Sequence, residues 1–276
     1  MTDRYAVIGN PIAHSKSPLI HKMFAEQTVQ DISYEKIEAP LDGFAAKIDE
    51  LRKAGYKGCN VTVPFKTQAY QLSKEFASAE AKSAQAVNTM GFDLTNVVYG
   101  ENTDGIGLIN DIKNNSKIEF NGKRILLIGA GGAARGVCLP IKLEKPKVFC
   151  IVNRDVKKAQ SLVEEFRGLG TSQIEFRQST FEQLSGNAFD IVINATSAGL
   201  TDSEIPLPKN IFAPGALAYD MMYGRETPFM KFAREHGAAV ISDGLGMLVE
   251  QAAESFFLWR GVRPETPPVI AALRHP

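Results

Sequence analysis

The feature that most constrains the fold is a glycine-rich turn between a strand pattern and a helix pattern. In "RILLIGAGGAARG", residues 124–136, an apolar run reaches Gly129 and a helix-forming stretch follows. Gly129, Gly131 and Ala134 have the spacing G-x-G-x-x-(G/A), which in this context is typical of dinucleotide-binding βαβ units. Gly129 permits the tight turn, and Gly131 lets backbone N–H groups approach a pyrophosphate. We therefore expect a Rossmann-type domain; the alternative is a tight turn without a ligand.

Strand patterns alternate with helix patterns along the whole chain. Apolar runs such as "YAVIG", "GCNVTV" and "DIVINA" are separated by amphipathic stretches such as "SPLIHKMFAEQT" and "DVKKAQSLVEEFRG". This alternation predicts an α/β fold with parallel sheets covered by helices. The segment 112–124 is polar and turn-rich, so we expect it to be a connection. The prediction is a two-lobed protein, with an N-terminal α/β domain followed by a Rossmann-type dinucleotide-binding domain.

The composition excludes several classes of function. The chain has 276 residues, 44% of them hydrophobic and 22% charged, as in ordinary globular proteins with one large or two modest domains. A formal net charge of zero argues against nucleic acid or a membrane surface as partner. The absence of a long apolar run or signal peptide pattern predicts a cytoplasmic protein. Cys59, Cys138 and Cys150 lack metal-ligand spacing, so we expect buried thiols and no metal; monomer and homodimer both stay open.

The strand after the glycine turn ends in "IVNRDVKK", which bears on the choice of cofactor. An acid about 20 residues beyond the turn usually binds the ribose 2′-hydroxyl of NAD. Here Asn153 and Arg154 precede Asp155, and Lys158 follows one turn later. Arg154 and Lys158 favour a 2′-phosphate and hence NADP, whereas Asp155 would repel that phosphate. NADP is the favoured reading; the structural alternative is a solvated helix start with Asp155 near its positive end.

Short polar clusters follow several predicted strands. They contain Ser15, Ser17, Lys66, Asn88 and Asp104. Because ligand crevices in open α/β sheets lie at the carboxyl ends of strands, these residues are candidates for a binding site. Each also has a structural reading: Lys66 as a surface lysine, and Ser17 and Asp104 as helix caps.

Several segments together resemble one family. These are "GNPIAHSKSP", "NVTVPFK", "AVNT", "NTDGIG", "GAGGAARG", "NATSAG", "YDMMYGRETPF" and "DGLGMLVEQAA". They stand in the order found in shikimate dehydrogenases, and the resemblance runs from about Tyr5 to Gly261. It implies an NADP-dependent enzyme that reduces 3-dehydroshikimate to shikimate on the route to aromatic amino acids. The implied partner is a small-molecule substrate, with neither nucleic acid nor membrane.

The resemblance also implies roles for individual residues. Lys66 and Asp104 would be the catalytic pair, because hydride transfer to a ketone develops negative charge on an oxygen that a proton donor must meet. The implied substrate-binding residues are Ser15, Ser17, Thr62, Asn88, Tyr223 and Gln251. The cofactor-binding residues from the motifs and the resemblance are Gly129, Ala130, Gly131, Gly132, Ala133, Asn153, Arg154, Asp155, Lys158, Thr196, Met221 and Gly244.

The family fold implies a discontinuous substrate-binding domain at 1–104 and 241–276, around an NADP-binding domain at 105–240. The chain departs from the family pattern at two positions, since Asp155 stands where Ser or Thr is frequent and Gln85 where Gly is frequent. Ser17 favours shikimate, because relatives that prefer quinate often have Thr there. Two alternatives stay open: a quinate/shikimate dehydrogenase that uses NAD, and a non-catalytic dinucleotide-sensing module.

Overall fold

The structure, a computed structural model, divides the chain into two compact units. It describes every residue except 1, 94–96, 170–172, 199–202 and 275–276. Unit 1 consists of Met1–Gly107 and Leu248–Pro276, and unit 2 of Leu108–Met247. The domain boundaries expected from the sequence, after residues 104 and 240, fall a few residues before those of the units. Helices α5 and α9 therefore each contribute residues to both units.

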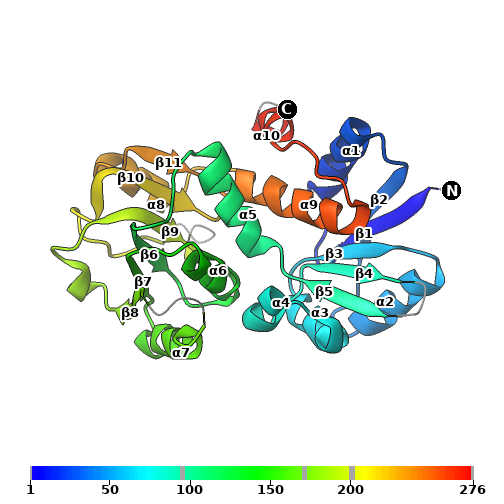
Figure 1. Cartoon of the computed structure of the whole chain (residues 1–276), viewed down its shortest axis with the longest axis horizontal. Coiled ribbons are helices and arrows are strands. Elements are labelled where there is room, and N and C mark those ends of the chain that lie inside the picture. The colour runs from blue at the N-terminus through cyan, green and yellow to red at the C-terminus, as the bar shows by residue number, and fades with distance from the viewer. Residues whose placement is uncertain (1, 94–96, 170–172, 199–202, 275–276) are drawn as a thin grey trace. The chain divides into compact units, whose positions relative to one another are not determined.

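Unit 1 is built on a five-stranded sheet in the order β2-β1-β3-β4-β5 (Figure 1). The strands are β1 (Asp3–Gly9), β2 (Ile32–Glu38), β3 (Gly58–Val61), β4 (Thr89–Phe92) and β5 (Val98–Glu101). The helices are α1 (Ser17–Thr28), α2 (Phe44–Lys53), α3 (Lys66–Ser73), the 3-10 turn Lys74–Phe76, α4 (Ala79–Ala84), the start of α5 (Asp104–Asn110), most of α9 (Leu245–Arg260) and α10 (Pro267–Arg274). Strands β1, β2 and β3 are parallel, as expected, but β4 and β5 are antiparallel additions that the sequence analysis did not identify.

The core of unit 1 lies on both faces of this sheet. On one face Phe44 of α2 stacks on Phe65, with ring centroids 4.9 Å apart, within a cluster that also holds Ile8 and Cys59. Elsewhere in the unit α1, β2 and α9 bring aromatic rings together around His21. These contacts bury apolar side chains against the sheet, and this burial of hydrophobic surface stabilises the unit.

Unit 2 contains a six-stranded parallel sheet in the order β11-β10-β9-β6-β7-β8. Its strands are β6 (Arg124–Ile128), β7 (Val148–Val152), β8 (Glu175–Ser179), β9 (Phe189–Asn194), β10 (Phe212–Asp220) and β11 (Val240–Ser242). Its other elements are the π-helix Asp111–Asn115, α6 (Gly132–Leu143), α7 (Val156–Phe166), the 3-10 turn Glu182–Leu184 and α8 (Pro228–Glu235). Read from β8, this is the order 3-2-1-4-5-6 of the dinucleotide-binding fold, which confirms the expected fold class.

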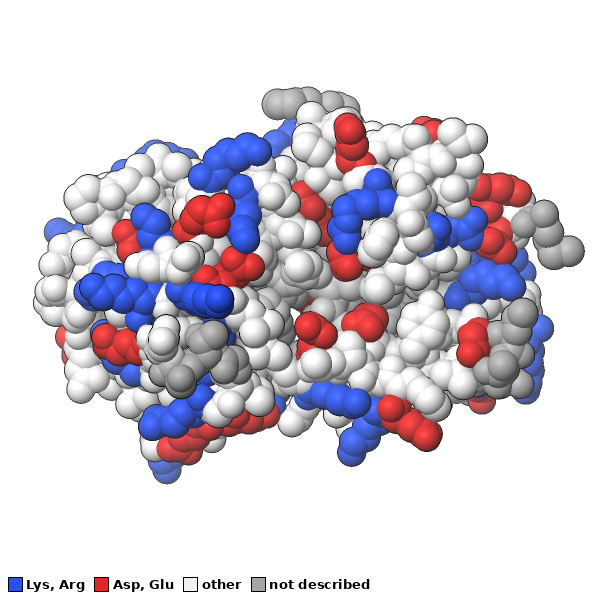
Figure 2. Space-filling model, in the orientation of Figure 1, with Lys and Arg blue, Asp and Glu red and all other residues white. Residues whose placement is uncertain are grey.

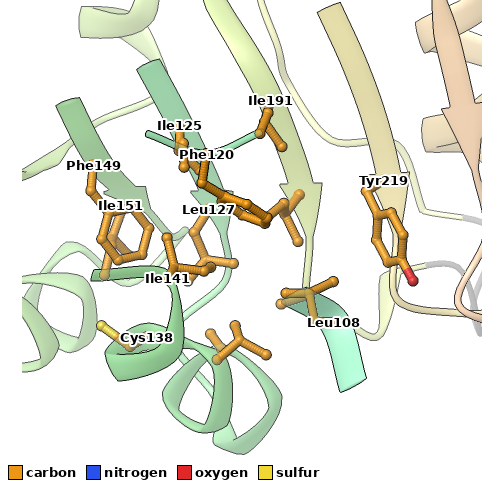
Figure 3. Packing of buried hydrophobic residues seen from close by; sticks show 14 of the residues in the cluster. Leu108, Phe120, Ile125, Leu127, Cys138, Ile141, Phe149, Ile151, Ile191 and Tyr219 are labelled. Carbon is orange, nitrogen blue, oxygen red and sulfur yellow. The ribbon is translucent and has the colours of Figure 1, made fainter. Parts of the chain in front are cut away.

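Branched and aromatic side chains fill unit 2 between the sheet and its helices. Leu127 of β6, Phe149 of β7 and Ile141 of α6 are fully buried and belong to one cluster (Figure 3). The cluster also includes Ile112 and Phe120, both 0% exposed. The expectation that 112–124 is only a connection is therefore wrong, because two of its apolar residues are core residues of unit 2.

The surface carries both signs of charge. Figure 2 shows Lys and Arg side chains interspersed with Asp and Glu on the visible face of each unit. Cys59, Cys138 and Cys150 are buried and unpaired with one another, as expected. No helix in the described part of the chain has the length and apolar character needed to cross a membrane.

His21 is a fully buried titratable residue in unit 1. Its ring stacks on Tyr34 with centroids 4.1 Å apart. Neither ring nitrogen has a hydrogen-bond partner of normal geometry among the described residues. Burial lowers the pKa of His21 from 6.5 to about 3, so the folded protein keeps this ring neutral where the unfolded chain would protonate it.

This difference predicts acid sensitivity. Below its unfolded pKa, the unfolded chain binds one more proton at His21 than the folded protein, so the free energy of unfolding falls by up to about 1.4 kcal/mol per pH unit. His21→Phe retains an aromatic ring without the titration. Its urea midpoint should therefore drop less between about pH 7 and about pH 4.5 than the wild-type midpoint does. His14→Gln, at an exposed position, is the control and should keep the wild-type pH dependence; equal slopes for all three proteins would contradict the prediction.

Candidate active site

The candidate substrate residues of unit 1 gather at one edge of its sheet. Strands β1 and β3 are parallel, and two successive antiparallel pairings return β5 to the direction of β3. The carboxyl ends of β1, β3 and β5 and the amino end of β4 therefore share an edge. The chain segments at this edge carry Ser15, Ser17, Thr62, Lys66, Asn88 and Asp104. The topology thus brings together residues that are far apart in the sequence.

Lys66 and Asp104 form an ion pair at this edge. Lys66 is the first residue of α3, and its Nζ lies 2.6 Å from Asp104 Oδ2. The two side chains are 29% and 21% exposed, so the pair is partly shielded but reachable from solvent. Asp104 is the first residue of α5, and the Oδ1 atom of Asn102 accepts its backbone N–H over 3.1 Å. Its carboxylate oxygens accept from the side chains of Lys66 and Asn88.

Asn88 is the second partner of Asp104. Its Nδ2 donates to Asp104 Oδ1 over 2.8 Å and reaches Gln251 Oε1 of α9 at 3.3 Å. Its Oδ1 accepts the backbone N–H of Thr103 over 2.9 Å. Asn88 is only 3% exposed, so these bonds fix both the position and the orientation of its amide.

A buried polar cluster beneath this pair was not identified from the sequence. Asn60 Nδ2 lies 3.1 Å from Thr89 Oγ1 and 3.0 Å from Ser255 Oγ, and the two hydroxyl oxygens are 2.7 Å apart. Thr103 Oγ1 joins the cluster at 3.4 Å from Ser255 Oγ. All four residues are nearly inaccessible. The sequence feature that could have indicated this cluster is Asn60, a polar residue inside the apolar strand pattern "GCNV".

Ser15 and Ser17 lie at the start of α1. The helix begins at Ser17 with Lys16 at the N-cap position, so the reading of Ser17 as an N-cap is wrong. Instead Ser15 Oγ accepts the backbone N–H of Ser17 over 3.3 Å.

Two other residues that the sequence analysis named are fixed by local packing and backbone geometry. The methyl group of Thr62 packs against Gly9, where an added Cβ would lie 2.5 Å away. Gln85 adopts a left-handed φ of 52° at the C-cap of α4, which is a conformation that glycine adopts most readily.

Unit 2 carries a cavity of about 830 Å³ at the carboxyl ends of β6, β7, β9 and β10. It is lined by Gly129, Ala130, Gly131, Gly132, Ala133, Arg135, Asn153, Arg154, Lys158, Ala195, Thr196, Ser197, Ala198, Met221 and Met222. Gly129 has a φ of 116°, and a Cβ added at Gly131 or Gly132 would meet no atom within 4 Å. Backbone N–H groups at the start of α6 are therefore open to an anionic ligand.

The charged residues of this cavity are Arg135, Arg154 and Lys158, and no described lining residue is acidic. Asp155 lies outside the lining. Its carboxylate accepts the backbone N–H groups of Lys157 and Lys158 over 3.1 and 3.4 Å, and so caps α7. Arg135 forms an ion pair with Glu165, whereas Arg154 and Lys158 give the cavity a cationic wall, which fits the phosphates of a dinucleotide with an additional 2′-phosphate.

The buried carboxylate of Asp220 holds together the chain segments that follow β9 and β10 beside the cavity. Asp220, the last residue of β10, accepts from Thr227 Oγ1 over 2.5 Å and from Asn194 Nδ2 over 3.1 Å. Asn194 Oδ1 in turn accepts the backbone N–H of Thr196. Burial raises the pKa of Asp220 above its usual range. Asp220 and Thr227 were not identified from the sequence as part of this support.

Two predicted site residues, Gly244 and Tyr223, lie outside the groups of residues with which the sequence analysis placed them. Gly244 does not line the cavity, but an added Cβ there would lie 2.2 Å from the carbonyl oxygen of Met221, which does. Tyr223 follows β10 and is 36% exposed, and it belongs to unit 2 rather than to the polar edge of unit 1. Gly199, the last residue of the "NATSAG" segment, lies outside the described residues.

The strand order of unit 2, its glycine turn and its cationic cavity define a two-domain α/β protein of the dinucleotide-binding class. Family models match most of the chain: the shikimate dehydrogenase substrate binding domain at 7–90, Shikimate / quinate 5-dehydrogenase at 111–201 and the Shikimate 5′-dehydrogenase C-terminal domain at 244–274. The chain belongs to the shikimate dehydrogenase family.

Full-length relatives agree with the family models. A shikimate dehydrogenase (NADP(+)) of Methylobacillus flagellatus is 55% identical over 99% of this chain and 99% of its own. An Ael1 enzyme from Pseudomonas putida is similar in structure, with a TM-score of 0.93 and 47% identity over 100% of this chain and 99% of that one. Shikimate 5-dehydrogenase from Thermus thermophilus, solved with NADP(H) and shikimate, gives a TM-score of 0.86 and 32% identity over 99% of both chains. The expected family and fold are thus confirmed.

Two substitutions at Asp155 distinguish the contribution of its capping hydrogen bonds from that of its negative charge. Asp155→Ala removes the acceptor for two N–H groups of α7 and should cost about 1 kcal/mol of unfolding free energy. Asp155→Asn retains a capping acceptor and should stay within a few tenths of a kcal/mol of the wild type. Urea denaturation of both variants, followed by far-UV circular dichroism, checks this difference. Equal stability of the two variants would show that Asp155 does not cap the helix.

Proposed function

We propose that the protein interconverts 3-dehydroshikimate and shikimate with NADP(H), and that Lys66 and Asp104 carry the proton transfer. The observation that carries the proposal is the ion pair of Lys66 Nζ and Asp104 Oδ2 at 2.6 Å. It lies among amide and hydroxyl groups at the polar edge of unit 1. The family relatives named shikimate dehydrogenase (NADP(+)) support the substrate and the cofactor.

The residues of this chain supply the proton and the positioning. NADPH, when bound, supplies the hydride that goes to the carbonyl carbon of the substrate. Lys66, as an ammonium, donates a proton to the carbonyl oxygen as negative charge develops there. Asp104 stays ionised, holds Nζ in place and stabilises the ammonium before transfer. In the reverse direction, neutral Lys66 accepts the proton of the substrate hydroxyl and Asp104 stabilises the resulting ammonium.

Neutral polar groups suit the remaining surface of shikimate, which has one carboxylate and three hydroxyls. Hydroxyl groups of Ser15 and Ser17 would bind the carboxylate, and the family resemblance assigns the hydroxyl of Tyr223, in unit 2, to the substrate as well. Thr62, Asn88 and Gln251 would bind ring hydroxyls, because hydroxyl and amide groups can both donate and accept. An analogue that lacks a hydroxyl would leave such a group unpaired, so the site would reject it.

The cavity of unit 2 would hold the cofactor. Gly129, Gly131 and Gly132 would let the pyrophosphate approach the N-terminus of α6. Arg154 and Lys158 would pair with the 2′-phosphate, whereas the Asp155 carboxylate is directed to the N–H groups of α7 and lies outside the cavity lining. This arrangement favours NADP over NAD. Thr196 and Met221 complete the cavity on the side of β9 and β10.

An assay of shikimate and quinate with NADP⁺ and NAD⁺ distinguishes the two alternative functions from the proposed one. Comparable turnover of quinate, or of shikimate with NAD⁺, would identify a dual-specificity quinate/shikimate dehydrogenase. Binding of NADP⁺ without turnover of shikimate or quinate would indicate a dinucleotide-sensing module. The paired Lys66 and Asp104 favour the enzyme. We also propose that the enzyme acts in the cytoplasm, as a monomer or a homodimer.

Removal of the proposed proton donor should abolish most of the activity. Lys66→Ala should lower kcat for shikimate oxidation by about 10²- to 10⁴-fold, because positioned acid–base catalysis contributes that much. The affinity for NADP⁺, measured by fluorescence titration, should change less than about twofold, since Lys66 does not line the cavity of unit 2. The control is Lys74→Ala, an exposed lysine beyond the same helix, which should leave kcat unchanged. Near-full turnover by Lys66→Ala would refute its role.

Removal of the proposed 2′-phosphate partners should change cofactor selection. The double variant Arg154→Ala, Lys158→Ala should raise KM for NADP⁺ by roughly tenfold to a hundredfold, as two charge-assisted hydrogen bonds are lost. KM for NAD⁺ should change much less, because NAD⁺ lacks the phosphate. Lys157→Ala, a lysine of α7 that does not line the cavity, is the matched control. Parallel losses for both cofactors would show that these residues do not read the 2′-phosphate.

A further inference from the structure

Tyr34 of β2 contacts the buried polar cluster beneath the candidate site of unit 1. Its phenol donates to Asn60 Oδ1 over 2.7 Å. Burial raises the pKa of Tyr34 well above 10, so the phenol stays protonated and can donate this bond.

The amide of Asn60 has a single satisfactory orientation. Its Nδ2 faces the carbonyl oxygen of Asn88 at 3.1 Å, as well as the hydroxyl oxygens of Thr89 and Ser255. A carbonyl oxygen can only accept, so the NH₂ end must face Asn88 and the Oδ1 end must face Tyr34. Asn60 is 6% exposed, so loss of the phenol would leave Oδ1 without its close donor in a buried site.

The connection continues from Asn60 to the proposed catalytic carboxylate. The carbonyl oxygen of Asn88 accepts from Asn60 and also from the backbone N–H of Val61 over 2.8 Å. The side chain of the same residue donates to Asp104 Oδ1 over 2.8 Å. Asn60 therefore restrains the backbone of the residue whose side chain orients Asp104. Lys66 lies on the other oxygen of that carboxylate.

We propose that Tyr34 is a positioning residue, which through Asn60 and Asn88 holds the carboxylate of Asp104 in place. This inference rests on the proposed function, because that function assigns Asp104 to proton transfer. Tyr34 touches no reacting atom in this assignment. Its hydroxyl acts by removing the freedom of two buried amides, so that the carboxylate is oriented before the substrate binds.

The hydroxyl can be removed without the ring. Tyr34→Phe keeps the aromatic ring that stacks on His21 at 4.1 Å, so the aromatic cluster retains its shape. The matched control is Tyr56→Phe in the same unit. The Tyr56 hydroxyl also makes hydrogen bonds, one of them from Arg4 at 2.6 Å, but its partners Arg4 and Glu35 lie outside the connection to Asp104. Both variants lose one phenol hydroxyl with its hydrogen bonds.

Steady-state kinetics and unfolding then separate positioning from stability. Tyr34→Phe should lower kcat for shikimate by roughly fivefold to tenfold and raise KM for shikimate, while KM for NADP⁺ stays within about twofold. Tyr56→Phe should change neither kcat nor KM for shikimate. Both variants are compared at equal fractions folded. In an Asp104→Asn background the additional effect of Tyr34→Phe on kcat should fall below about twofold, because the oriented carboxylate is absent.

A spectroscopic readout tests the connection independently of turnover. The side-chain amide resonances of Asn60 and Asn88 in ¹⁵N-correlated spectra should shift in Tyr34→Phe and stay unchanged in Tyr56→Phe. Unchanged amide resonances, or the same kinetic effect in both variants, would overturn the positioning role. A wild-type protein that does not turn over shikimate would instead contradict the proposed function. In that case the resonances still decide whether Tyr34 holds Asn88.

Discussion

The hydrogen bond from the backbone N–H of Thr103 to Asn88 Oδ1, at 2.9 Å, is the constraint on which the candidate site depends. It forces the NH₂ end of Asn88 toward Asp104, because an amide cannot present both ends to one neighbour. The reverse orientation would set the amide oxygen against a carboxylate. The pairing of β4 with β5 brings the two residues together, since Asn88 directly precedes β4 and Thr103 lies two residues beyond the end of β5. Sheet geometry thus determines the direction of a side chain in the site.

Local patterns in the sequence predicted the elements that local physics determines. The helix expected from "SPLIHKMFAEQT" is α1, Ser17–Thr28, because amphipathic spacing and Pro18 define it without help from the rest of the chain. The glycine turn was likewise predictable, because the spacing of Gly129, Gly131 and Ala134 itself shows what the backbone requires there. The polar clusters at strand ends indicated the edge where Lys66 and Asp104 meet.

Features that depend on distant residues were not predictable in this way. β4 and β5 are four residues long, each contains a glycine, and only their antiparallel pairing makes them strands. The bond between Asn60 and Ser255 joins residues 195 positions apart, and no local pattern reports it. Segment 112–124 appeared to be a connection because its polar residues outnumber Ile112 and Phe120, which only the packing of unit 2 shows to be buried.

The cap at the start of α7 has a consequence for how this protein can change over evolutionary time. The carboxylate of Asp155 satisfies backbone groups that any helix start leaves open, so it stabilises the start of α7. Arg154, one position earlier, makes no contribution to that cap. In the function proposed for Arg154, selection on cofactor preference can therefore act on that residue while selection on helix stability acts on its neighbour. Two adjacent residues are free to diverge under separate pressures, and a lineage could exchange cofactors without first sacrificing a helix.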